Sequence, residues 1–200
     1  MNAGATAERI YASLKRDICS GQYRPGDRLD PALLASSLNA SVTPVRDALH
    51  LLCGEGLIAT RTGDGFHLPA IDAPALQDLY TWNAEVLLLA LKARTRPPPP
   101  HTETEAIGSE TEIARIFAII AARSGNMEHD RMLGALNDRL ATARLAEAAI
   151  LSPADRETRN LAAAVTARDL ARQRGIITRY HQVRRRHADG IVRAMYRGAS

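Results

Sequence analysis

The sequence predicts a mainly α-helical fold, in which three short helices and a β-hairpin are followed by an all-α helical bundle. Apolar residues recur at helical spacing along most of the 200 residues. A strand-like pattern occurs near residues 57–68, around a glycine-containing turn. The composition, 46% hydrophobic and 24% charged, is ordinary for a folded protein. We therefore expect two domains, residues 1–70 and residues 71–200.

Three helices are expected first, at about Thr6–Ser20, Pro31–Leu38 and Thr43–Glu55. In the first, Ile10, Leu14 and Ile18 repeat every four residues and would line one buried face. The inner face of the third would consist of Val45, Leu49 and Leu52. The second starts with Asp30 as a plausible N-cap and a proline at its first position.

The hairpin and the bundle follow from a change of pattern. The hairpin consists of a strand, a tight turn and a returning strand, at Leu57–Arg61, Thr62–Gly65 and Phe66–Leu68. The rest is expected to be helical, with Gly175 as a helix break, at about Ala73–Ala93, Glu105–Arg123, Met127–Ile150, Pro153–Arg174 and Ile176–Arg197. Its prolines make residues 94–104 a stiff linker.

This order of elements is that of a winged helix-turn-helix, which binds double-stranded DNA by placing one helix in the major groove. The third helix is the candidate recognition helix, because small hydroxyl residues and an arginine stand at its start: Ser41, Thr43, Pro44 and Arg46. The hairpin from Arg61 to Leu68 is the candidate wing. Its candidate DNA contacts are Arg61, Gly63, Gly65 and His67; Arg61 and His67 are otherwise plain surface residues of the hairpin, and both glycines are needed for the turn whatever the function.

A specific series of residues lies between Ile18 and Leu68: Gly21, Pro25-Gly26, Leu29, Leu34-Ala35, Leu38, Ser41, Thr43-Pro44-Val45-Arg46, Ala48-Leu49, Glu55-Gly56-Leu57 and Gly65-Phe66. In order and spacing it resembles the DNA-binding domain of the GntR family of bacterial transcription regulators. Two positions depart from the family pattern: Val42 replaces a usual arginine, and Pro31-Ala32 replaces a common glutamate–arginine pair. The apolar Val42 leaves two outcomes open: it contacts a thymine methyl group instead, or DNA binding is weaker or altered.

The second half is similar to the FCD ligand-sensing domain in one branch of that family, through Asp78-Leu79-Tyr80, Phe117, Ala122-Arg123-Ser124-Gly125-Asn126, His187–Ile191, Ala194 and Gly198. The resemblance implies a helical bundle that holds a metal ion or a small carboxylate. However, Ala114 and Ala118 stand where an aspartate and a histidine would be, and Asn83 replaces a frequent arginine. His187 alone matches a metal ligand, so neither a metal nor another cofactor is expected. We expect the bundle to form a homodimer.

The distribution of charged residues leaves functions other than DNA binding open. Residues 1–70 hold seven basic and seven acidic side chains, whereas residues 168–197 hold nine arginines and two aspartates, a C-terminal excess that we read as a solvated helix face. Two alternatives therefore stay open beside the regulator: a protein-interaction adaptor with weak or no DNA affinity, and a metal-free sensor of an unknown small-molecule effector.

No catalytic motif is present, so we do not expect an enzyme. Without a membrane span or a signal, and with Cys19 and Cys53 in apolar patterns, a cytoplasmic protein is expected.

Overall fold

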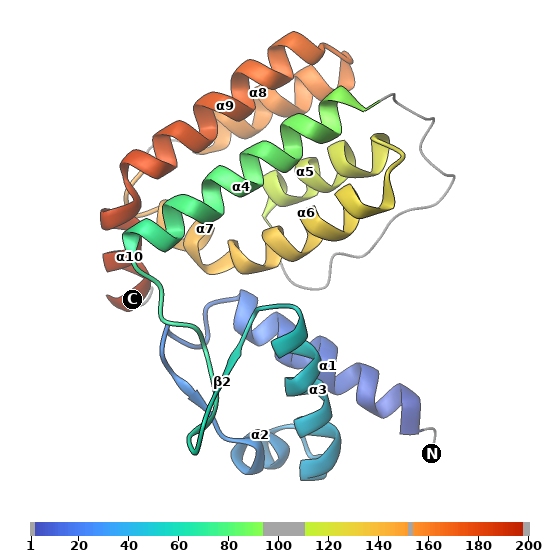
Figure 1. The fold of residues 1–200 in the computed structure, drawn as a ribbon, viewed down its shortest axis with the longest axis vertical. Helices are drawn as coiled ribbons and strands as arrows, with labels where there is room; N and C mark the ends of the chain where they lie inside the picture. The colour runs from blue at the N-terminus through green and yellow to red at the C-terminus, as the bar shows by residue number, and fades with distance from the viewer. Residues whose placement is uncertain (1–2, 94–110, 152–153, 198–200) are drawn as a thin grey trace.

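A computed structural model describes residues 3–93, 111–151 and 154–197 (Figure 1). Within them, α-helices dominate, and all strands lie in the N-terminal part of the chain. We call residues 3–68 the winged part and residues 73–197 the helical domain. The predicted mainly α fold, with N-terminal helices and a wing before a helical domain, is confirmed. The expected linker at residues 94–104 lies outside the described residues.

The elements of the winged part, in chain order, are α1 (Ala3–Cys19), β1 (Arg28–Leu29), α2 (Pro31–Ser37), α3 (Val42–Gly54), β2 (Ala59–Arg61) and β3 (Gly65–His67). The predicted N-cap of α2 is confirmed, because the Asp30 carboxylate accepts hydrogen bonds from the N–H groups of Ala32 and Leu33 at 2.8 and 3.2 Å. The apolar faces predicted for α1 and α3 are buried in one core, which includes Ile10, Leu14, Ile18, Val45, Leu49 and Leu52.

The sheet corrects one expectation, because it has three strands where the sequence predicts a two-stranded hairpin. Its order is β1-β3-β2, and both pairs are antiparallel. Leu29 of β1 lies opposite Phe66 of β3. Strand β1 has only two residues, too few to show an alternating pattern, and its partner is distant in sequence. Only the tertiary fold therefore identifies it as a strand.

The helical domain consists of α4 (Ala73–Lys92), α5 (Glu112–Arg123), α6 (Met127–Arg139), α7 (Ala141–Glu147), α8 (Ala154–Thr166), α9 (Leu170–Arg186) and α10 (Ala188–Arg197). Asp72 caps α4 by accepting the Ala75 N–H at 2.8 Å. Helix α4 crosses the domain and packs against α5, α6, α9 and α10 (Figure 1). Leu76, Leu87 and Phe117 are completely buried in this domain.

Several helix boundaries in this domain differ from the prediction. The segment 127–150 is two helices, which meet at Leu140. Gly175 does not end a helix, because α9 runs through it. The break lies instead before α9, where Arg168 has φ +55° and the Asp169 carboxylate caps the new helix through the Arg172 N–H at 2.9 Å. Helix α5 begins at Glu112, after Thr111 with extended backbone angles, and the predicted start at Glu105 lies outside the described residues.

The two parts are joined by the short connection 69–72, and α10 holds that connection in place. The Tyr196 hydroxyl lies 3.2 Å from both the N–H and the carbonyl oxygen of Ile71, donating to the oxygen and accepting from the nitrogen. The wing tip and the α2–α3 turn lie at the end of the molecule away from the helical domain (Figure 1). A flat partner can therefore approach this end without meeting the helical domain.

Candidate nucleic-acid interface

The first turn of α3 presents the residues that the sequence singles out. Ser41 occupies the N-cap position with extended backbone angles, and its side chain makes no capping hydrogen bond. Val42, Thr43 and Arg46 are exposed and Pro44 is half-buried. The opposite face of α3 is buried in the core. Within the described residues, the first-turn N–H groups are thus left uncapped by Ser41 at a position suited to a phosphate group.

The wing tip is built from two glycines with left-handed backbone angles. Gly63 and Gly65 have φ of +78° and +80°, which a side chain would disfavour. The turn is closed by a hydrogen bond of 3.1 Å from the Asp64 N–H to the Arg61 carbonyl oxygen. Arg61 is exposed beside this turn. The geometric role predicted for both glycines is therefore confirmed.

His67 does not lie on the surface of the hairpin, where the sequence places it. Its side chain is buried, with Nε2 3.0 Å from Asp64 Oδ2 and Nδ1 3.3 Å from the Gly65 carbonyl oxygen. Both contacts hold the wing turn from inside, so His67 shapes the wing and does not face outward. Phe66, His67 and Leu68 are all buried, so this returning strand does not alternate between a buried and an exposed face.

One residue of this surface is missed by the sequence analysis. His50 is exposed on α3, and its ring meets the edge of the buried Phe66 ring of β3, with centroids 5.0 Å apart. His50 lies four residues after Arg46, hence on the same helix face. In the sequence, only this four-residue spacing from Arg46 could have indicated that His50 belongs to the same surface. The contact joins α3 to strand β3 of the wing.

The balanced charge of residues 1–70 is distributed unevenly in space. Four of the seven carboxylates point to partners inside the winged part: Asp27 to the Arg24 N–H, Asp30 to the start of α2, Glu55 to Lys15 and Tyr11, and Asp64 to His67. Arg46 and Arg61, by contrast, are exposed near the α3 start and the wing tip. Asp47 and Asp64 are also exposed beside these two arginines, so the surface carries charges of both signs.

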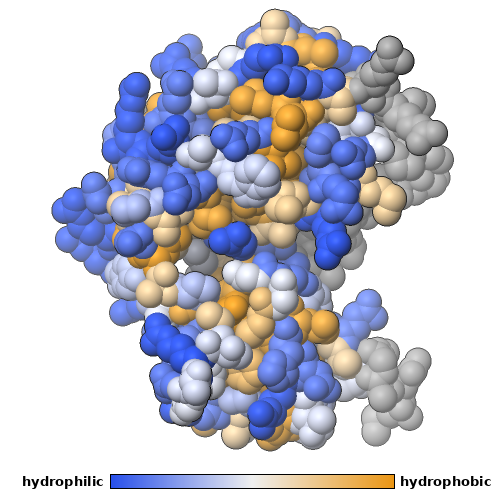
Figure 2. Space-filling model, viewed as in Figure 1, coloured by the Kyte–Doolittle hydropathy of each residue, from blue (hydrophilic) through white to orange (hydrophobic). Residues whose placement is uncertain are grey.

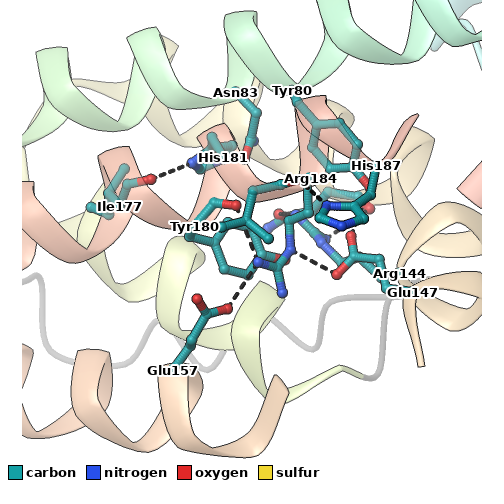
Figure 3. Close-up of polar contacts among 12 residues, drawn as sticks. Tyr80, Asn83, Arg144, Glu147, Glu157, Ile177, Tyr180, His181, Arg184 and His187 are labelled. Carbon is teal, nitrogen blue, oxygen red and sulfur yellow. Dashed lines mark hydrogen bonds and ion pairs between the residues drawn. The ribbon is translucent and has the colours of Figure 1, made fainter. Parts of the chain in front are cut away.

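The helical domain contains a buried polar cluster around Arg184 (Figure 3). The Arg184 guanidinium is 1% exposed; its Nε donates to Glu147 at 2.8 Å and its Nη1 to Glu157 at 2.9 Å. It also lies over the Tyr180 ring, 3.3 Å from the centroid. Burial lowers the pKa of Arg184, but Tyr180 and the two carboxylates outweigh it and keep the pKa above its usual value. This corrects the expectation that the C-terminal arginines form only a solvated face; the other eight are exposed.

His181 occupies the middle of the same cluster. Its Nδ1 lies 2.7 Å from the Ile177 carbonyl oxygen and its Nε2 2.8 Å from the side-chain amide of Asn83. Burial, reinforced by the positive charges of Arg144 and Arg184, lowers its pKa to about 3. The Asn83 atom at this distance is Oδ1, whereas a neutral ring that donates from Nδ1 accepts at Nε2; turning the amide over would bring its unpartnered nitrogen to this position as a donor.

Among the described residues, no group of three or more histidine, cysteine, aspartate or glutamate side chains is arranged so that it could hold a metal ion. His187 is exposed at the end of α9, where Nδ1 lies 2.8 Å from the Val183 carbonyl oxygen. Ala114 is buried.

In the described part of the chain, no helix is both long enough and apolar enough to span a bilayer.

Comparison with known proteins identifies the winged part. Residues 6–68 match the family model described as bacterial regulatory proteins, gntR family. The chain is 31% identical over 114 residues to the Nta operon transcriptional regulator of Aminobacter aminovorans, covering 57% of this chain and 50% of that protein. It is 31% identical over 83 residues to the transcriptional repressor GlaR of Escherichia coli, covering 40% and 38%. The chain thus spans half or less of the length of these curated relatives.

Solved structures share the fold over nearly the whole chain. E. coli McbR/YncC superposes with a TM-score of 0.69 at 20% identity, covering 94% of this chain and 98% of that one. A GntR transcriptional regulator from Rhodococcus sp. RHA1 superposes with a TM-score of 0.70 at 17% identity, covering 92% and 97%. The family match over the winged part and the shared fold of the helical domain agree with each other. Residues 6–68 therefore carry the winged helix-turn-helix of the gntR family of bacterial regulatory proteins, and a helical domain follows whose fold is shared with solved regulators.

Proposed function

We propose that the protein is a transcription regulator that binds double-stranded DNA through the α3 start and the wing. The observation that carries this proposal is the joint exposure of Val42, Thr43 and Arg46 at the uncapped start of α3, at the end of the molecule away from the helical domain. Arg46 is suited to a guanine edge or a phosphate, and Val42, 42% exposed, to a thymine methyl group. Its place of action is the cytoplasm, where bacterial DNA lies.

The proposed contact set is Ser41, Val42, Thr43, Pro44 and Arg46 of α3, with Arg61, Gly63 and Gly65 of the wing. His67 is left out because it is buried. We further propose that residues 1–70 and 71–200 are the two domains, the first reading DNA and the second joining two copies.

Replacing Arg46 with alanine should weaken DNA binding by about 1–3 kcal/mol, or roughly 5–150-fold, because the removed guanidinium is the main charged group at the α3 start. The measurement is a mobility shift, at several salt concentrations, on duplexes selected from a random pool by the unaltered protein. Arg179→Ala is the matched control, an exposed arginine on α9 in the helical domain. Equal affinity of Arg46→Ala and the unaltered protein would place the DNA-reading surface elsewhere.

We propose that the protein acts as a homodimer, because helix-turn-helix proteins commonly read two half-sites one or more helical turns apart. An apolar face of α4 supports this: Trp82 and Leu89, seven residues apart, are 41% and 49% exposed. Figure 2 shows apolar surface gathered over the helical domain on this side of the molecule.

The dimer predicts a mass of twice 21.7 kDa by sedimentation equilibrium. Leu89→Glu should shift the protein towards monomer, since a carboxylate would be desolvated in the contact. Met127→Glu, at a residue 84% exposed on α6, should leave the mass unchanged. A mass of one chain at all concentrations for the unaltered protein would exclude the dimer.

A further inference from the structure

A polar junction around Lys15 of α1 connects the winged part to the helical domain. Its Nζ lies 2.9 Å from Glu55 Oε2 and 2.8 Å from Asp138 Oδ2. The Tyr11 hydroxyl accepts a third bond from Nζ at 3.1 Å and itself donates to Glu55. The side chains of Lys15 and Asp138 are only 12% and 11% exposed. Such buried, charge-assisted hydrogen bonds are stronger and more directional than surface ion pairs.

The two carboxylates belong to opposite sides of the junction. Glu55 is the C-cap of α3, the candidate recognition helix. Asp138 lies in the last turn of α6, in the helical domain. One ammonium group therefore joins the C-terminal end of the recognition helix to α6. Burial by itself lowers the pKa of Lys15, but its hydrogen bonds to Asp138 and Glu55 outweigh burial and hold the pKa above its usual value.

Apolar contacts surround this ion pair. Ala141 of α7 is buried as part of the core of the winged part. A Cβ atom at Gly21, after α1, would lie 3.4 Å from Leu145 Cδ1 of α7. The Cys19 thiol also faces the Asp138 carbonyl oxygen, at 3.8 Å. The two parts therefore meet in a packed junction and not only through the connection 69–72.

The end of α6 is also held from the side of the helical domain. Asn137 precedes Asp138, and its side-chain oxygen accepts from Arg144 Nη2 at 2.9 Å while its nitrogen donates to the Ala114 carbonyl oxygen at 3.1 Å. Arg144 in turn lies over the Phe117 ring, 5.5 Å from its centroid. Adjacent residues of α6 thus bind the domain core and Lys15, which leaves Asp138 little freedom to move alone.

We infer that Lys15 and Asp138 are positioning residues, which tie the C-terminal end of α3 to α6 so that the helical domain sets the direction in which α3 presents its first turn to DNA. This inference rests on the proposed function. The tie itself is a property of the free protein. It can therefore be measured without DNA.

The first test measures how the two parts tumble. Backbone ¹⁵N relaxation of the free, full-length protein should give one rotational correlation time for α3 and α9. Asp138→Asn should give α3 a shorter time than α9, because Lys15 loses its partner across the junction. Asp130→Asn, the same change at an exposed position of α6, should behave like the unaltered protein. Asp138→Glu, which keeps the charge, should restore joint tumbling.

The second test uses selected duplexes that carry either the paired site or one half of it. Asp138→Asn should bind the paired site about tenfold more weakly and the single half-site unchanged, because only paired binding requires a fixed direction of α3. Joint tumbling in Asp138→Asn, or equal loss on both duplexes, overturns the inference. If the unaltered protein binds no selected duplex, the proposed function fails, and the tumbling result alone decides whether the tie exists.

Discussion

Replacing Arg184 with methionine should lower the free energy of unfolding of the helical domain by about 3–5 kcal/mol. The physical reason is the carboxylate that the change leaves behind. Glu147 is 3% exposed, and Arg184 Nε is its partner at 2.8 Å. Without the guanidinium, Glu147 still accepts a hydrogen bond from the Tyr80 hydroxyl at 2.7 Å, but a neutral hydroxyl cannot compensate a buried negative charge.

The measurement is urea unfolding followed by the fluorescence of Trp82, the sole tryptophan of the sequence, which lies on α4 and reports on this domain. Arg185→Met is the matched control: it changes the same residue type at the next position, which is exposed, and should shift stability by less than about 0.5 kcal/mol.

A double variant separates charge from packing. Adding Glu147→Gln to Arg184→Met should recover a large part of the loss, because no uncompensated charge then remains. A loss in Arg184→Met as small as in the Arg185→Met control would show that the cluster does not stabilise the domain.

Lowering the pH from 7 to 5 should destabilise the helical domain by about 2 kcal/mol through His181 alone. The pKa of this imidazole is about 3 in the folded chain, against about 6.5 when unfolded. Between these values the unfolded chain binds a proton that the folded chain does not, so acid favours unfolding. The stability is complete above pH 6.5 and falls by about 1.4 kcal/mol per pH unit below it.

The cause of this shift is the surroundings of the ring. Phe117 stacks on it with centroids 5.7 Å apart, and the rings of Tyr80 and Tyr180 pack edge-on. The positive Arg144 and Arg184 also disfavour a second positive charge. Among the groups around His181, Glu147 is the carboxylate, and it is hydrogen-bonded to Tyr80 and Arg184.

Urea unfolding at pH 7 and pH 5 tests this prediction by difference. The unaltered protein should lose about 2 kcal/mol more over this interval than His181→Gln, whatever the stability of the variant at pH 7. The ring ¹⁵N shifts of His181 should report a neutral imidazole at pH 5. A charged ring at that pH would contradict the proposed burial.

Sequence reasoning was most effective for the proposed DNA-binding surface, which consists of the α3 start and the wing. Helical spacing predicted the buried faces of α1 and α3, and the order of helix, turn and glycine-rich hairpin predicted the wing. These signals are local, so they survive without knowledge of the fold. His67 is buried where the sequence predicted a surface residue, and His50 was missed, because the burial of His67 and the contact of His50 with Phe66 arise only from the tertiary packing of the wing.

The sequence by itself determined the class of fold, the start of the recognition helix and the glycine turn of the wing. The tertiary structure alone decided which charged residues are buried. Arg184 lies in an arginine-rich stretch whose other arginines are exposed. Lys15 lies in α1, whose main signal in the sequence is the spacing of its apolar residues. Each is buried only because carboxylates from distant segments, Glu147, Glu55 and Asp138, compensate its charge, and no local pattern records that pairing.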